Sequence, residues 1–247
     1  RLTNGRLRSP TFTYRGIEID DVAAVWSFRT GDIIWNIRES GLYGGKATLT
    51  GHYNTQARAG LLALKVKEVK LPPLLKAVGT SAEGTGKAGK LSGNCRLHFL
   101  QDWSGMALQL NGNGKLKITE AYLWSVPMFA QLGRLLTVPS LGRIATLDAD
   151  LDFNGKRIGV PRLDTDGTIV SLSGRGEYSW QSDKIHFRVQ GETLKRVRGI
   201  AFVLKPLSWV FDAELTGTLE DHKWRMITVL EKALSPGDGG ADVNEIR

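Results

Sequence analysis

Residues 106–138, MALQLNGNGKLKITEAYLWSVPMFAQLGRLLTV, decide the fold. In the first half of this stretch apolar residues alternate with polar ones, and the apolar parity holds Met106, Leu108, Leu110, Leu116 and Ile118. A period of two predicts a strand with one apolar and one solvated face. In the second half the apolar spacing changes to three and four, at Phe129, Leu132, Leu135 and Leu136, which predicts a short amphipathic helix.

The same alternation runs through most of the chain, so the sequence predicts a mainly β protein. Many glycines (29) with few prolines (8) favour strands joined by tight turns. Thr30-Gly31 predicts a hairpin turn, and a change of parity at Glu68 predicts a β-bulge. The predicted strands are 6–14, 16–20, 22–29, 32–39, 41–51, 59–71, 90–101, 106–119, 146–155, 156–163, 168–180, 184–191 and 211–219, and the predicted helices are 72–79, 126–138 and 193–209.

A polar, glycine-rich stretch, TSAEGTGKAG (80–89), is the predicted internal boundary. It divides the chain into a β segment of residues 1–79, which ends in a short helix, and a second domain of residues 80–228. Residues 229–247 are predicted to form a flexible tail, because their turn formers show no periodicity.

Leucine, a polar residue and glycine recur as a triplet on several strands. Residues i and i+2 of a strand share a face, so each glycine is predicted to open a gap beside its leucine in the apolar face. This arrangement favours a curved sheet with a roomy apolar concavity, and the alternative is ordinary sandwich strands with glycines at bulges. The triplets begin at Leu49, Leu91, Leu110, Leu172 and Leu215.

The sequence offers little for catalysis, so no enzyme activity, catalytic residue, metal site or cofactor is predicted. The four histidines are far apart, the one cysteine has no neighbouring base, and nucleophile-elbow and phosphate-loop motifs are absent. Asp148, Asp150 and Asp152 form a carboxylate row, but the turn glycine of a calcium loop is missing, which favours a solvated face.

The net charge of +8 attracts anionic partners. Scattered tryptophans do not make a stacking platform, so no nucleic-acid binding is predicted.

The order of the motifs over residues 87–226 resembles the C-terminal domain of the AsmA family of bacterial envelope proteins. The matching motifs are GKLSGNCRL, then LNGNGKLKITEAYLWSVPMFAQLGRLL, TLDADLDFNG with TIVSLSGRGEYSW, and FVLKPLSWVFDAELTGTLEDHKWRM. Two positions depart from the family pattern, because Ala121 stands where glycine is common and His222 replaces the usual proline. Residues 17–79 look like the repeat region that precedes this domain.

The resemblance implies a long, curved antiparallel sheet, U-shaped like a taco, with an apolar groove and two or three short amphipathic helices. It also implies a periplasmic protein that conducts phospholipid between the inner and outer membranes and supports outer-membrane integrity. The resemblance further implies an inner-membrane anchor N-terminal to this fragment, and the start at Arg1 without Met is expected of a piece of a longer protein. An outer-membrane or envelope protein is the expected protein partner.

The apolar parity of the predicted strands gives the residues expected to line the lipid groove. The alternative function is a scaffold for outer-membrane protein biogenesis, which would hold client strands along a sheet edge. The predicted lining residues are Leu64, Val66, Met106, Leu108, Leu110, Leu116, Ile118, Leu147, Leu151, Phe153, Val170, Leu172, Tyr178, Trp180, Ile185, Phe187 and Val189.

Overall fold

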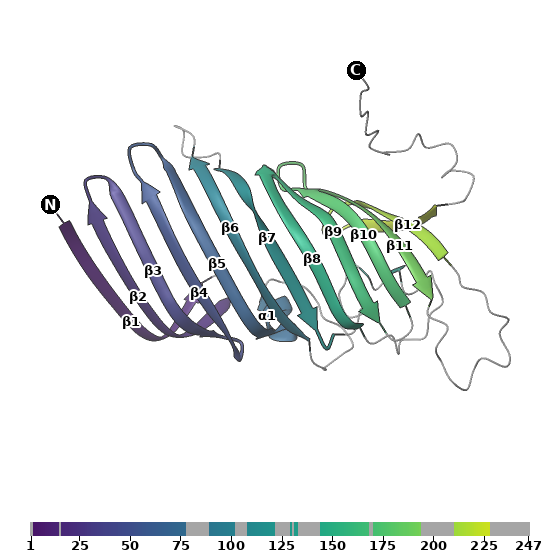
Figure 1. Cartoon of the computed structure of the whole chain (residues 1–247), viewed down its shortest axis with the longest axis horizontal. Coiled ribbons are helices and arrows are strands. Elements are labelled where there is room, and N and C mark those ends of the chain that lie inside the picture. Colours follow the sequence, from purple (N-terminus) through teal and green to yellow (C-terminus); the bar gives the residue numbers. More distant parts are fainter. Residues whose placement is uncertain are drawn as a thin grey trace, which may run out of the picture.

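The structure is a computed structural model that describes residues 2–14, 16–77, 89–101, 108–121, 129, 131–132, 144–167, 170–193 and 210–227. These residues form a sheet with one short, complete helix, which follows β5 and lies at the ends of the central strands (Figure 1). The helix is α1 (Leu71–Ala77). The strands are β1 (Leu2–Tyr14), β2 (Ile17–Arg29), β3 (Asp32–Leu42), β4 (Gly45–Asn54), β5 (Ala59–Lys70), β6 (Lys90–Gln101), β7 (Leu108–Thr119), β8 (Ile144–Gly155), β9 (Arg157–Gly167), β10 (Val170–Ser179), β11 (Lys184–Thr193), β12 (Val210–Gly217) and β13 (His222–Ile227).

All strands belong to a single 13-stranded sheet whose strand order is the order of the chain. Each strand pairs antiparallel with the one before it and the one after it, and Figure 1 shows them side by side as one long, curved layer. The prediction of a mainly β protein with a long curved antiparallel sheet is confirmed. The sheet also continues across the predicted boundary at 80–89, because β5 and β6 pair from Lys70↔Lys90 to Ala59↔Leu100.

Two local predictions about the backbone are confirmed. Thr30 and Gly31 join β2 to β3 with φ angles of 44° and 90°, the positive values that a tight hairpin turn requires at both central positions. Glu68 has a φ of 53°, and the β5–β6 register shifts between Val66 and Val69. This bulge keeps both valines on the apolar face although they are three residues apart.

The structure corrects three strand assignments. Residues 16–20 and 22–29 belong to one strand, β2, with an irregularity at Asp21, where φ is 52°. β9 runs to Gly167 rather than ending at 163, because a bulge around Pro161 restores the alternation that proline interrupts. β13 was not predicted, since six residues are too few for alternation alone to identify a strand.

The predicted helices are described only in part. α1 begins at Leu71 and places two prolines in its first turn, where a missing backbone N–H is tolerated. Within 126–138, Phe129, Gln131 and Leu132 are helical, and the other residues lie outside the described part. Of the predicted helix 193–209, Thr193 belongs to β11 and 194–209 lie outside the described residues, as does the predicted tail.

Candidate functional site

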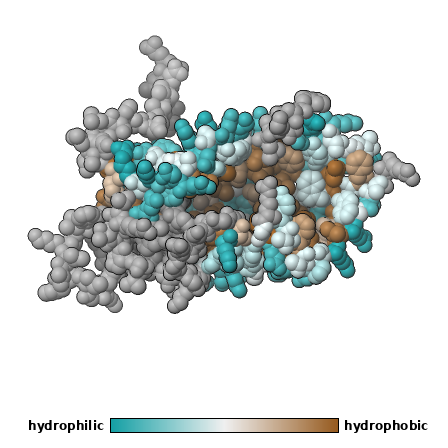
Figure 2. Space-filling model, turned by 180° about the vertical axis from the view of Figure 1, so that it is seen from behind, coloured by the Kyte–Doolittle hydropathy of each residue, from teal (hydrophilic) through white to brown (hydrophobic). Residues whose placement is uncertain are grey.

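The sheet has an apolar face, defined here as the face that carries Leu64, Leu116 and Leu172. Directly paired residues of antiparallel strands point to the same side, and the pairings Leu64↔Cys95, Cys95↔Gly114 and Gly114↔Leu151 carry this face from β5 to β8. Figure 2 shows apolar residues gathered along the middle of this side of the molecule, between more polar residues at its margins. The opposite side is called the polar face.

The register places most of the predicted lining residues together on the apolar face. Trp180 instead lies in the turn between β10 and β11, where its backbone N–H donates to the carbonyl of Lys156 at 3.2 Å. Met106 and the side chains of Leu108 and Val170 lie outside the described part. The residues on the apolar face are Leu64, Val66, Leu110, Leu116, Ile118, Leu147, Leu151, Phe153, Leu172, Tyr178, Ile185, Phe187 and Val189.

The exposure of this face differs between its two ends. Strands β1–β7, called the open region, leave large apolar side chains accessible, including Leu7 (46% exposed), Trp26 (39%) and Phe28 (42%). Strands β8–β13, called the packed region, bury most of theirs, with Leu172 at 2% and Leu215 at 0%, although Met226 of β13 remains 37% exposed. Most predicted lining residues of β5–β7 are therefore partly accessible, whereas those of β10 and β11 lie mainly in a core.

Side chains from the segment after β7 pack into this core. Phe129 and Leu132 are both buried in the same cluster as Leu147, Leu172 and Leu215. The ring of Phe129 stacks on Trp224 of β13, with 6.1 Å between the ring centroids and 28° between the planes. The described part of the predicted helix 126–138 thus packs across the sheet.

Among the glycines of the Leu-polar-Gly triplets, Gly51 does not leave the gap predicted beside its leucine, and Gly176 shows the same arrangement outside the triplets. A Cβ on Gly51 would lie 2.2 Å from the ring of Trp35, and one on Gly176 would lie 2.3 Å from the ring of Phe187. In both pairs the glycine and the aromatic residue are direct cross-strand partners. The ring fills the space over the glycine and removes the proposed gap. The same arrangement occurs at Gly5–Trp26, Gly60–Phe99 and Gly191–Phe211.

The carboxylate row on β8 forms ion pairs on the polar face. Arg162 Nε donates to Asp150 Oδ2 at 2.8 Å, and Lys117 Nζ lies 3.7 Å from Asp148 Oδ1. The hydrogen bond from Arg162 holds the pKa of the Asp150 carboxyl below its usual value. Within the described ranges, no group of three or more His, Cys, Asp or Glu side chains could hold a metal ion.

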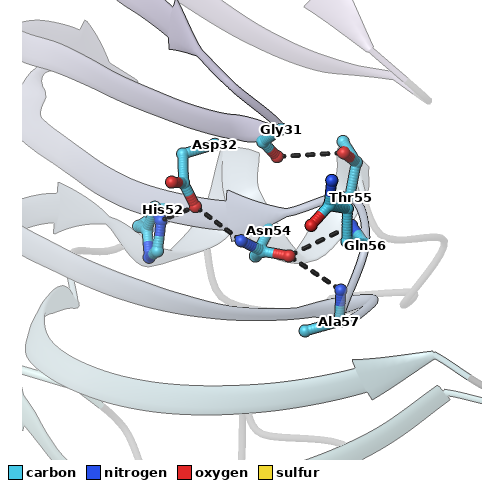
Figure 3. Close-up of polar contacts among 7 residues, drawn as sticks. All are labelled: Gly31, Asp32, His52, Asn54, Thr55, Gln56 and Ala57. Carbon is cyan, nitrogen blue, oxygen red and sulfur yellow. Dashed lines mark hydrogen bonds and ion pairs between the residues drawn. The ribbon is translucent and has the colours of Figure 1, made fainter.

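A second polar cluster lies where the β2–β3 and β4–β5 turns meet at one end of the strands (Figure 3). Asp32 Oδ1 lies 2.9 Å from His52 Nε2 and accepts a 2.8 Å hydrogen bond from the Asn54 amide, so both contacts lower the pKa of Asp32. The Asn54 carbonyl oxygen accepts from the backbone N–H groups of Gln56 and Ala57. The only hydroxyl drawn, that of Thr55, donates to a backbone carbonyl, so the cluster orders a turn rather than activating a nucleophile.

The surroundings of Cys95 and His186 likewise do not activate either side chain as a nucleophile or a base. Cys95 lies on the apolar face, where burial raises the pKa of its thiol and disfavours the nucleophilic thiolate. His186 is exposed, and its Nε2 lies 2.8 Å from Oε1 of Glu214. Among the helices of the described part, none is long and apolar enough to cross a membrane.

Comparisons with protein-family models, with curated proteins and with solved structures give no match to this chain.

Proposed function

We propose that this chain is a segment of an inner-membrane-anchored periplasmic protein that conducts phospholipid between the inner and outer membranes. In this proposal the curved sheet forms a U-shaped groove, acyl chains lie against the apolar face, and head groups stay at the polar margins. The family resemblance suggests the location and the cargo. The observation that carries the proposal is the row of accessible apolar side chains on the open region.

The energetics favour such a cargo. Each methylene removed from water contributes roughly 0.8 kcal/mol, so an acyl chain gains most from a long, continuous apolar surface. The register makes the apolar face continuous across neighbouring strands of the open region, for example from Ile37 through Leu49 to Leu64. A surface of this kind holds a chain by contact area and imposes no fixed position, which suits movement along the groove.

Photo-crosslinking tests the proposal with matched pairs of neighbouring residues. A photoreactive amino acid at Leu64 or Leu110 faces the apolar side, whereas the same group at the neighbouring Ala63 or Asn111 faces the polar side, outside any cluster of lysines. We expect crosslinks to phospholipid in cells only from the two positions on the apolar side. Equal crosslinking from the positions on the two sides would contradict an apolar lipid path.

A charge in the groove gives a functional test. Leu110 is partly accessible and lies in the open region, so Leu110→Asp should leave the sheet folded while blocking lipid transfer. Asn111→Asp adds the same charge one residue away on the polar face and is the control. Transfer that survives Leu110→Asp in a folded protein would remove this position from the path.

A scaffold that holds client strands is the second candidate, and one observation favours it. β1 is a 13-residue edge strand whose outer side pairs with no strand of the described part, and its Phe12 and Tyr14 are exposed. A long edge of this kind can accept an added strand. Site-specific crosslinking from Arg8 to an extended client segment, with no lipid crosslinked at Leu64, would support this candidate over the conduit.

A further inference from the structure

A depression on the polar face spans five strands and gathers basic side chains from three of them. It has a volume of about 590 Å³ over β5–β9, and its floor is the backbone of apolar-face residues such as Val66, Gly93 and Leu116. We call it the lysine depression. It is lined on the polar side by Lys65, Lys67, Ser92, Asn94, Lys115, Lys117, Asp148, Asp150 and Arg162.

The charges in the lysine depression do not cancel. Its lining includes four lysines and Arg162 but only two carboxylates. Among the described residues, no carboxylate lies within ion-pair distance of Lys65 or Lys67. The ammonium groups of Lys115 and Lys117 lie 3.9 and 3.7 Å from their aspartates, and the two lysine side chains are 77% and 52% exposed. Such loose surface pairs contribute little, so an arriving anion can compete for these lysines.

The middle strand leaves room between the two lysine pairs. β5 and β7 lie on either side of β6, so their lysines start about 10 Å apart, twice the spacing of neighbouring strands. β6 carries only the short side chains of Ser92 and Asn94 between them. Ser92 Oγ accepts a 2.9 Å hydrogen bond from the backbone N–H of Glu68, which leaves its own O–H free to donate. An anion above β6 would therefore meet ammonium groups from both sides and polar donors beneath.

We infer that the lysine depression binds a multiply charged, phosphorylated ligand. Lysine ammonium groups act as point charges for phosphate, and four of them suit more than one negative charge. The volume admits a phosphate ester and exceeds what a single phosphate needs. No aromatic residue lines the depression, so it lacks the stacking platform of a nucleic-acid site. This site lies on the opposite face from the proposed lipid path and does not depend on it.

Two probes separate the sources of the phosphate. Inorganic pyrophosphate is titrated calorimetrically into the chain, and co-sedimentation is measured with phosphatidylcholine vesicles that contain phosphatidic acid. Binding of pyrophosphate indicates a soluble ligand, whereas binding of the vesicles alone indicates a lipid head group, and both support the site. We expect binding to weaken steeply with added salt. Failure of both probes to bind the unmodified chain at low salt would overturn the inference.

Matched variants locate the binding. Lys65→Gln with Lys67→Gln should reduce affinity about 10-fold or more, equivalent to about 1.4 kcal/mol. Lys184→Gln with Lys223→Gln removes the same charge from exposed lysines elsewhere and should change it little. Equal losses in the two double variants would reduce the effect to net charge and refute the site.

A third variant leaves every lysine in place. Asn94→Asp puts a carboxylate between the lysine pairs and should also weaken binding, and it decides the question if the Lys65/Lys67 variant fails to fold. An affinity unchanged by Asn94→Asp would contradict the assignment. A single-stranded oligonucleotide that binds there more tightly than both phosphate probes would replace it with nucleic-acid binding.

Discussion

The open and packed regions are built from the same alternating strands, yet they use their apolar faces differently. In the open region, Trp26 and Phe28 remain about two-fifths exposed. In the packed region, Phe129 and Leu132 come from outside the sheet and help to bury the corresponding row of side chains. Strand alternation thus creates an apolar face, whereas the segments packed on that face decide whether it becomes a buried core or stays accessible.

The first test compares two leucines of the apolar face, one from the packed region and one from the open region. Leu172→Ala leaves a cavity in the packed region and should lower the free energy of unfolding by about 2–5 kcal/mol. Leu7→Ala in the open region removes the same atoms from a side chain that is 46% exposed and should cost at most about 1 kcal/mol. Urea denaturation measures both. Similar losses would mean that the open region is as tightly packed as the other.

The second test compares the cost of adding a methyl group beneath an aromatic ring in the two regions. Gly176→Ala should destabilise the chain by about 1–3 kcal/mol, because the Phe187 ring above it is buried and cannot move away freely. The ring over Gly51 belongs to Trp35, which is only half-buried and has room to rotate, so Gly51→Ala should cost less. Thermal melts of the two variants check the order, and a reversed order would contradict the difference in packing.

An exposed aromatic residue separates binding from stability. Phe28→Ser should change the free energy of unfolding by less than about 1 kcal/mol, because this side chain remains 42% exposed. It should nevertheless reduce the phospholipid recovered by crosslinking from Leu64. A variant that unfolds the chain would show that Phe28 belongs to a core rather than to a binding surface.

The smallest effect is electrostatic and lies on the polar face of the packed region. Hydrogen bonds from Arg225 and His186 lower the pKa of Glu214. A lowered pKa means that Glu214 adds stability above its unfolded value of about 4.3, and that this stability is lost as pH falls through the lower folded pKa. Glu214→Gln should therefore lower the Tm at neutral pH, and the difference should narrow in acid. A difference that stays constant with pH would assign the effect to packing.

Much of the sheet could be predicted from single-strand patterns. The alternation of Leu116 with Lys115 and Lys117 identifies both faces of β7, and the parity change at Glu68 identifies a bulge. Which strands the segment after β7 would cover could not be predicted, because this depends on Phe129 meeting Trp224, almost a hundred residues along the chain. The glycine–aromatic pairs were also missed, since alternation within one strand carries no information about its partner. The register of a hairpin, such as β10–β11 around its turn, would have placed Phe187 over Gly176.

The lysine depression also could not be predicted from the alternation within single strands. Lys65, Lys67, Lys115 and Lys117 are ordinary solvated positions when each strand is considered alone. They become a local concentration of charge only because β6, with its short polar side chains, lies between β5 and β7. Net charge indicated an anionic partner, but strand order was needed to locate it.

The identity of strand order and chain order has a consequence for how this sheet folds and how it can change. Every strand finds its partners next to it in the sequence, so hairpins can form early and recruit further strands one at a time. Stability should then resemble a sum over neighbouring pairs, as in solenoid proteins. Insertion or loss of a whole hairpin would lengthen or shorten the apolar face without disturbing any other pairing. The reach of the sheet is thus a quantity that evolution can adjust in steps of two strands.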